Sequence, residues 1–547
     1  MSNKPGSITL VQLTRFGDIL QTIWAVKDIR QLNPDLTVNI IVREKFGKPL
    51  AFLLEKYFTN IYYLNSNEFI GEDLTSGLDK TLKTINSWES NVLVNLSFSS
   101  SSSYLSSLID ANFKLGMSAS QFASDNVNGS WSEYLYSTVM RGPLNSFSLV
   151  DIFKFILGTK NRPNLPVKSH SGDTIVIHPF ASTEKKMWSP NKWGEIIFKT
   201  LKKNPELKIA IVGSHLDSAR AKLIMQNPLL SEYHKRINLN CGNLDFNQLY
   251  NLLEESFLFC GHDSMVGHLA SLAGLQTLTL SLGTVRAIES TPYGVNNYVL
   301  APRTPCFPCF PSDHCSDFKC HKDLSYQAVT ECLQQLIDTN EISSTELEKN
   351  VSPLHLSTAD VFQSNFSKEG LFYLENISSN DFSMNELYRK FYRIVWLYML
   401  EEMEENTEYP QLNKASYAGL EGFIPNLKQL FELAEFGKKY SRFILEEISK
   451  DQPDVEYIKS CGKKIEEIDE MQVLLGEASP ALNPIIDFFN LKKSKMAGNN
   501  LVELCTSSHE IYQSIGSFCN IMYELIEKTM NEYSIKMKKN SMKEAKE

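Results

Sequence analysis

Residues 8–20, ITLVQLTRFGDIL, decide the fold class of this chain. An apolar run from Ile8 to Leu13 leads into a tight turn at Gly17, and a helical pattern follows directly. A strand that ends in a glycine turn at a helix start presents backbone N–H groups and the positive end of the helix dipole to an anion. The stretch therefore predicts a Rossmann-like domain with a phosphate-handling turn.

The same order of elements recurs at residues 260–270, CGHDSMVGHLA, again between an apolar run and a helical pattern. Short β-branched runs alternate with helical patterns around both turns, which is typical of parallel sheets. The runs are 38–42, 60–64 and 91–96 in the first part, and 174–178, 208–212, 256–260 and 277–282 in the second. We expect two doubly wound α/β domains that face each other across a cleft, one holding a nucleotide-linked donor and the other an acceptor.

Three domains are expected along the 547 residues. A domain over 1–165 is joined by a Pro- and Gly-rich linker, residues 158–172, to a second domain over 172–340. The Ser-rich stretch 97–107 is predicted to be a loop at a strand end, or a solvated linker. From 355 to 547 long amphipathic patterns predict an acidic all-α domain of about three to five helices.

The charge is uneven: the whole chain carries −10, and residues 341–547 hold 23 basic and 34 acidic side chains. No part has the basic excess that nucleic-acid binding requires. No apolar run is long enough to cross a membrane, and the N-terminal residues do not resemble a signal peptide. We expect a cytoplasmic protein, with peripheral contact at the inner membrane left open.

Three stretches together resemble glycosyltransferase family 9, the ADP-heptose transferases. They are residues 13–34 (LTRFGDILQTIWAVKDIRQLNP), 175–196 (IVIHPFASTEKKMWSPNKWGEI) and 259–294 (FCGHDSMVGHLASLAGLQTLTLSLGTVRAIESTPYG). The resemblance covers roughly residues 7–340. It implies a GT-B fold, a nucleotide-diphosphate-sugar donor, no required catalytic metal and an inverting displacement.

The resemblance implies that Asp18 is the general base, which takes the proton of the acceptor hydroxyl as that oxygen attacks the anomeric carbon. A carboxylate within hydrogen-bond distance suits this step because a sugar hydroxyl is a poor nucleophile. Arg15 and Gly17 belong to the same turn, which the resemblance implies faces the acceptor and the phosphates. Taken from the residues alone, Asp18 also suits a helix cap.

On the donor side, Lys186 matches the lysine of the family's K-x-W element and would hold the diphosphate. A surface lysine is the alternative for Lys186, an exposed helix-start residue for Asp217, and a buried structural histidine for His268. Phe180 and Met265 depart from the family pattern and leave the identity of the donor open. The donor-binding residues that the resemblance implies are Ser182, Lys186, Asp217, Asp263, Ser264, His268, Gly283 and Thr284.

A cysteine cluster spans residues 306–320 with the spacing C-x2-C-x5-C-x4-C. Four thiolates in so short a loop suit tetrahedral zinc or iron, with reduced loop thiols as the alternative. The predicted structural metal ligands are Cys306, Cys309, Cys315 and Cys320.

The leading hypothesis is a glycosyltransferase that moves heptose, or a similar sugar, from a nucleotide sugar to a cell-envelope glycan such as lipopolysaccharide core. A surface or flagellar protein is the alternative acceptor, and the helical domain would then recruit that protein or form an oligomer. A third hypothesis is a decayed transferase that acts as a scaffold.

Overall fold

The structure is a computed structural model that describes residues 6–65, 74–120, 125–159, 172–378, 383–405, 410–496, 498 and 500–544. Most of the expected linker, residues 160–171, lies outside these ranges. The chain forms two compact units. Unit 1 comprises Met1–Asp125 and Phe147–Ser379, and unit 2 comprises Asn126–Ser146 and Asn380–Glu547.

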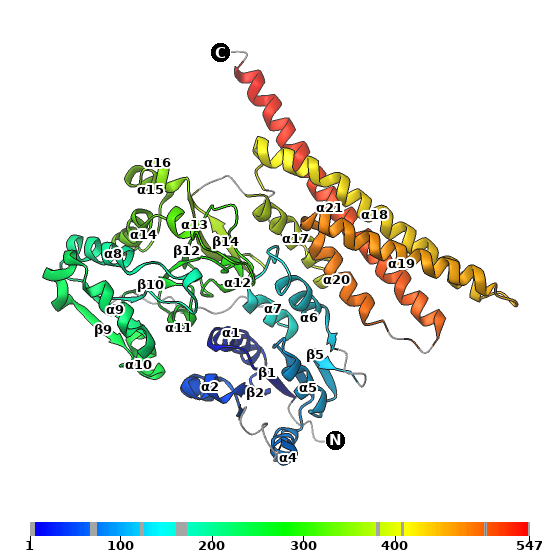
Figure 1. The fold of residues 1–547 in the computed structure, drawn as a ribbon, viewed down its shortest axis with the longest axis horizontal. Coiled ribbons are helices and arrows are strands. Elements are labelled where there is room, and N and C mark those ends of the chain that lie inside the picture. The colour runs from blue at the N-terminus through cyan, green and yellow to red at the C-terminus, as the bar shows by residue number, and fades with distance from the viewer. Residues whose placement is uncertain are drawn as a thin grey trace. The chain divides into compact units, whose positions relative to one another are not determined.

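The first sheet of unit 1 is parallel, with strands in the order β3-β2-β1-β4-β5 (Figure 1). The chain runs from β1 to β2 and β3 on one side and then returns to β4 on the other side of β1, so the strand order reverses beside β1, and ligands bind at such a switch point. Helix α1 (Phe16–Leu32) begins directly after β1. The strands are β1 (Ser7–Gln12), β2 (Thr37–Arg43), β3 (Asn60–Leu64), β4 (Val92–Asn95) and β5 (Phe113–Ala119), and the helices after them include α3 (Ala51–Tyr57), α4 (Leu74–Asn86), α5 (Ser100–Leu108) and α7 (Leu149–Ile156).

The second sheet has the order β14-β13-β12-β11-β10-β7-β8-β9. Its switch point lies between β7 and β10, so the loops that follow these two strands share one edge of the sheet. The strands are β7 (Thr174–His178), β8 (Lys208–Gly213), β9 (Ile237–Cys241), β10 (Leu258–His262), β11 (Thr277–Leu280), β12 (Tyr298–Pro302), β13 (Ala359–Phe366) and β14 (Phe372–Asn376). The helices that the site uses are α8 (Pro190–Lys203), α10 (Phe246–Glu255), α11 (Met265–Leu272) and α14 (Tyr326–Thr339).

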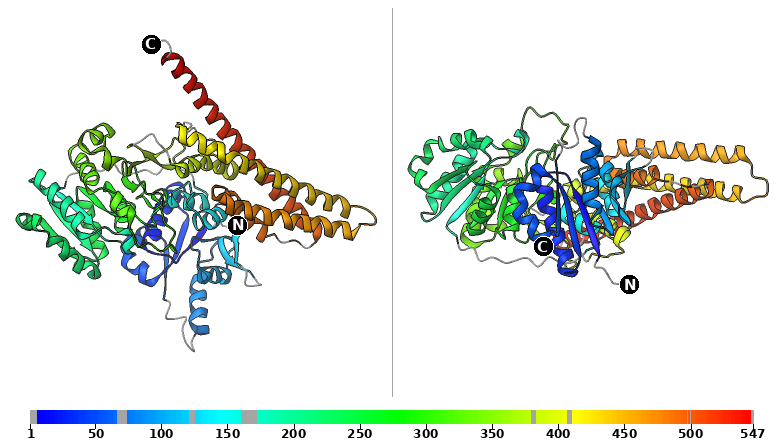
Figure 2. Two further views of the ribbon diagram at one scale, coloured as in Figure 1. Left: turned by 45° about the horizontal axis from the view of Figure 1, so that its top comes forward. Right: turned by 90° about the horizontal axis from the view of Figure 1, so that it is seen from below.

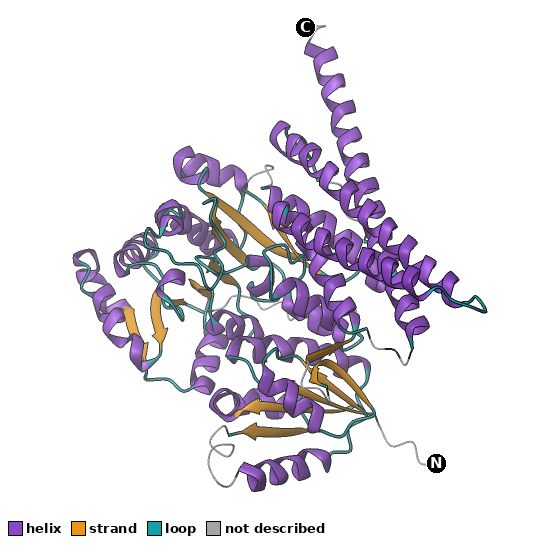
Figure 3. Ribbon diagram, turned by 45° about the vertical axis from the view of Figure 1, so that its right-hand side comes forward, coloured by secondary structure: helices purple, strands orange, loops and turns teal. Residues whose placement is uncertain are grey.

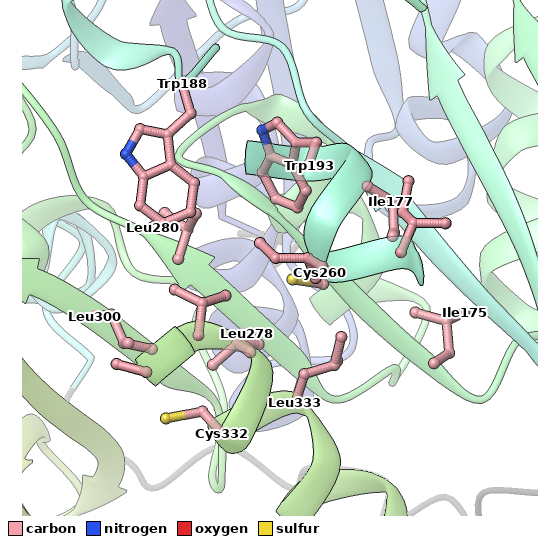
Figure 4. Close-up of a cluster of buried hydrophobic side chains, with 14 of the residues drawn as sticks. Ile175, Ile177, Trp188, Trp193, Cys260, Leu278, Leu280, Leu300, Cys332 and Leu333 are labelled. Atoms are coloured by element: carbon pink, nitrogen blue, oxygen red, sulfur yellow. The ribbon is translucent and has the colours of Figure 1, made fainter. Parts of the chain in front are cut away.

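Burial explains the apolar strand sequences of this sheet. Every residue of β10 and β11 is buried, as expected for parallel strands that are covered on both faces. Side chains from the central strands and from α14 form one core with Trp188 and Trp193 (Figure 4). The prediction of two doubly wound α/β sheets followed by a helical region is confirmed.

Unit 2 is helical over its C-terminal part (Figure 3). Helix α18 packs against both α19 and α21 (Figure 2). Trp396 of α17 contacts Phe488 and Phe518, with ring centroids 4.7 and 4.6 Å away. The helices are α6 (Ser130–Tyr134), α17 (Met384–Glu401), α18 (Lys414–Ile448), α19 (Val455–Ala478), α20 (Asn483–Ser494) and α21 (Leu501–Glu544).

The helical unit differs from the expected domain 355–547 in two places. Residues 359–376 are antiparallel strands that extend the second sheet, because β13 pairs with β12. Residues 126–146 belong with the helices instead of the first sheet's domain. None of the helices among the described residues combines the length and apolar character that crossing a membrane requires.

Candidate active site

The turn after β1 carries Asp18 in the first turn of α1. One carboxylate oxygen of Asp18 accepts a hydrogen bond from the backbone N–H of Arg15 at 3.1 Å. Asp18 is partly exposed, whereas Ile19 and Leu20 after it are fully buried. The carboxylate therefore stabilises the helix start, as a cap would, and also reaches solvent at the switch point of the first sheet.

The turn after β10 carries Asp263 and Ser264. The backbone N–H of Asp263 donates to the carbonyl of Leu280 at 3.2 Å, which ties the turn to β11. The Ser264 hydroxyl lies 3.0 Å from Nδ1 of His178. Burial lowers the pKa of His178 to about 4, so its imidazole is neutral. Ser264 precedes α11, and the N-terminus of that helix is aimed at the same edge of the sheet.

The two turns meet, although they come from different sheets of unit 1. Helices α1 and α11 are in contact, and a methyl group added to Gly17 would lie 3.4 Å from Cδ2 of His268. Burial lowers the pKa of His268, and the nearby carboxylates of Asp263 and Asp18 partly oppose that effect. The structure therefore brings Asp18 and His268 to one place.

Lys186 joins the same group from the loop after β7. Its Nζ lies 3.6 Å from a carboxylate oxygen of Asp263, with 23 % of the lysine side chain exposed. Lys186 also lowers the pKa of His268 through its positive charge, behind burial as the main cause. The site thus gathers one cation, two carboxylates and one imidazole.

Gly283 lies where no other residue fits well. Its φ is +62°, and an added Cβ would stand 2.4 Å from the carbonyl oxygen of Lys185. Glycine adopts a left-handed conformation with the least strain, and it alone has no Cβ to prevent so close an approach. Gly283 therefore lets the turn after β11 press against the loop of Lys186, with partly exposed Thr284 beside it.

Asp217 and Ser182 were also predicted to bind the donor, and their surroundings differ from those of Lys186. Asp217 accepts hydrogen bonds from the backbone N–H and the hydroxyl of Ser214, at 2.8 and 2.6 Å, and so closes its own turn. Ser182 is exposed in the loop after β7. Their donor roles stay predictions.

The departures at Phe180 and Met265 have different structural settings. Phe180 is 2 % exposed and belongs to the core of the second sheet, so its ring packs instead of lining the turn. Met265 is partly exposed at the start of α11.

The four cysteines of residues 306–320 range from exposed Cys306 to buried Cys320. Burial raises the pKa of the Cys309 and Cys320 thiols, and the neighbouring thiols raise both further. Within the part of the chain that the structure describes, no group of three or more His, Cys, Asp or Glu side chains is arranged to hold a metal ion. The cysteine loop contacts the turn after β11, because the N–H of Cys309 donates to the carbonyl of Gly283 at 2.9 Å.

Sequence reasoning missed two buried histidines beside this site, His178 and His262. Both stand at strand ends inside the stretches that resemble the family, where a polar residue after an apolar run marks a switch-point edge. A histidine at the end of an apolar run was therefore the sequence signal that could have identified both residues.

One sequence comparison bears on the class of the protein. Residues 158–319 match the sequence model of glycosyltransferase family 9 (heptosyltransferase). These residues therefore resemble the family 9 glycosyltransferases, and this likeness supports a glycosyltransferase. Comparison with curated proteins gives no match.

Solved structures resemble the chain at low identity. Heptosyltransferase WaaC of E. coli with ADP has a TM-score of 0.45 and 15 % identity, over 61 % of this chain and 99 % of that chain. ADP-heptose lps heptosyltransferase II of E. coli has a TM-score of 0.44 and 13 % identity, over 61 % and 100 %. A family 9 transferase from Veillonella parvula has a TM-score of 0.43 and 15 % identity, over 55 % and 86 %.

Proposed function

We propose that this chain is an inverting glycosyltransferase that moves a heptose, or a similar sugar, from ADP-heptose to a hydroxyl group. The observation that carries the proposal is the meeting of the Asp18 turn with Lys186, Asp263 and His268. A base and a cation on facing elements are what a displacement at an anomeric carbon needs: one removes a proton and the other holds the leaving group.

The proposed displacement is a single step. The acceptor oxygen bonds to the anomeric carbon while the bond from that carbon to the diphosphate oxygen breaks, and ADP leaves. Asp18 takes the hydroxyl proton. Lys186 offsets the charge that develops on the diphosphate; its 3.6 Å separation from Asp263 exceeds hydrogen-bond distance, so a phosphate oxygen can compete for the ammonium group. The N–H groups at the start of α11 are proposed to hold the phosphates, beside neutral His268.

We propose a cell-envelope glycan, such as lipopolysaccharide core, as the acceptor. The alternative acceptor is a surface or flagellar protein, which the helices of unit 2 would recruit. Exposed apolar side chains on α19, such as Leu474 at 61 % exposure, favour this alternative because such side chains contact partner proteins. The scaffold hypothesis remains if the chain binds no nucleotide sugar.

The test is transfer of labelled heptose from ADP-heptose into an extract of the source cells, followed by separation of lipid and protein fractions. Label in the lipid fraction supports the glycan acceptor, and label in the protein fraction supports the alternative. No label, together with no binding of ADP-heptose to the purified chain, would contradict the enzyme proposal and favour the scaffold.

Gly283→Ala is expected to lower the free energy of unfolding by about 1–3 kcal/mol, because alanine is strained at a positive φ. It should also weaken ADP binding, since the added methyl group would push the Lys185 carbonyl and shift Lys186. Thermal unfolding and ADP calorimetry measure the two effects. Gly422→Ala in α18 is the control, because no atom lies within 4 Å of the added methyl group there. Unchanged ADP affinity in Gly283→Ala would contradict the proposed link between Gly283 and the position of Lys186.

We propose that the cysteine loop holds structural zinc or iron; no step of the reaction involves that ion. The C-x2-C-x5-C-x4-C spacing supports this proposal. Metal analysis of the chain purified without oxygen should give about one ion per chain, and Cys315→Ser should lose the ion. Cys332→Ala, in the core of the second sheet, should keep it. An intact chain free of both metals would disprove the site.

A further inference from the structure

His262 is the last residue of β10 and is completely buried. Its Nε2 accepts two hydrogen bonds: one from the backbone N–H of Trp188 at 2.9 Å, and one from Nε1 of Trp193 at 3.2 Å. Because Nε2 accepts both, the ring proton of the neutral imidazole lies on Nδ1. Burial lowers the pKa of His262 well below its ordinary value, and nearby His178, His321 and Lys192 lower it further, so the ring stays neutral.

The two tryptophans are part of the loop and helix that follow β7. Figure 4 shows their indole rings over the core of the second sheet, and their centroids lie 6.1 Å apart. The His262 ring meets both edge-on, at 6.1 Å from Trp188 and 5.2 Å from Trp193. One imidazole thus joins the end of β10 to the loop that carries Lys186.

The loop is held on the other side of Lys186 as well. Nε2 of His321 lies 2.7 Å from the carbonyl oxygen of Lys185, and since a carbonyl only accepts, the imidazole donates. The backbone is therefore bound to one histidine just before Lys186 and to another two residues after it. The residue after His262 is Asp263, the carboxylate partner of Lys186.

We propose that His262 is a positioning residue, whose imidazole fixes the backbone of Trp188 and thereby sets Lys186 and Asp263 in register for the donor diphosphate. The proposal rests on the donor role of Lys186 proposed above. His262 itself does not touch the reacting atoms. Trp188 is only 2 % exposed, and His262 supplies the acceptor that the buried backbone N–H of Trp188 needs.

The test compares two variants of similar shape. His262→Gln offers an oxygen near the place of Nε2, whereas His262→Met offers no comparable acceptor. Cys260→Ala is the matched control, because Cys260 is a fully buried residue of the same strand that belongs to the core. Should His262→Met fail to fold, His262→Asn replaces it, since its shorter side chain does not reach the place of Nε2.

The first measurement is hydrogen exchange of the peptide 182–189 in the full chain, which needs no ligand. His262→Met should speed exchange at Trp188 by about tenfold or more, because a buried N–H loses its acceptor. His262→Gln should stay near the wild type, and Cys260→Ala should not change this peptide selectively. Equal exchange in the Met and Gln variants would overturn the proposal.

The second measurement is ADP affinity in a double-mutant cycle with Lys186→Ala. His262→Met should weaken ADP binding about tenfold in the wild-type background and have almost no further effect beside Lys186→Ala, because both changes remove the same contact. Additive losses would overturn the coupling to Lys186. If the wild-type chain binds neither ADP nor ADP-heptose, the proposed function fails, whereas the exchange comparison still decides whether His262 holds the loop.

Discussion

Asp18→Asn is expected to lower kcat by about 10²- to 10⁴-fold, the range that general base catalysis contributes. Asparagine has nearly the shape of aspartate, and its oxygen still accepts from the Arg15 backbone, so helix α1 should begin as before. What the variant lacks is a group that takes the acceptor proton. ADP affinity should stay within a few-fold of the wild type, as calorimetry would show.

The control for this variant is Asp245→Asn, at the start of α10. Asp245 also accepts a backbone hydrogen bond, from Gln248 at 2.8 Å, and it lies outside the site. Both variants should unfold at nearly the same temperature as the wild type, and only Asp18→Asn should lose turnover. A fully active Asp18→Asn would show that Asp18 is a helix-capping residue and nothing more.

Lys186→Ala is expected to lower kcat/KM by about 10²- to 10³-fold, the cost of removing one preorganised group from a site of developing charge. ADP should bind more weakly as well, because the diphosphate loses its cation. Initial rates over a range of donor concentrations, with ADP calorimetry, measure both effects.

The adjacent lysine provides the matched control. Lys185 donates from its ammonium group to the carbonyl of Asp313, away from Asp263, so Lys185→Ala should keep the donor KM near the wild-type value. Equal losses in the two variants would mean that the loop needs positive charge in general. Loss in Lys185→Ala alone would assign the diphosphate to that residue instead.

Most of the sheet strands could be predicted because buried parallel strands are apolar throughout. The hairpin of β13 and β14 could not, because two short antiparallel strands lie beside long helical patterns that dominate the composition there. The Ser-rich stretch was predicted as a loop or linker, and that was wrong: residues 100–108 form α5, capped by the Ser99 hydroxyl, which accepts from Ser102 at 3.2 Å. Serine is a poor helix former, but small side chains let this helix lie on β5.

The site was partly predictable for a similar reason. Turns at strand ends have glycine and aspartate signatures, so Asp18, Gly17 and Asp263 could be selected from the sequence. The direction of a buried ring has no such signature, since it depends on which loop returns to the strand end. His262 became interpretable only when the Trp188 backbone was seen beside it.

Unit 2 is discontinuous in sequence, with consequences for dissecting the protein. The segment Asn126–Ser146 is encoded far from Asn380–Glu547, yet Tyr134 packs on Trp396 at 5.4 Å and Glu133 pairs with Lys495. A chain ending at residue 379 would keep half of this interface and expose Trp131 and Tyr134, which are buried in the full chain. If such a truncated protein were insoluble, its exposed apolar side chains would explain the insolubility. The result would not show which acceptor the helices recruit.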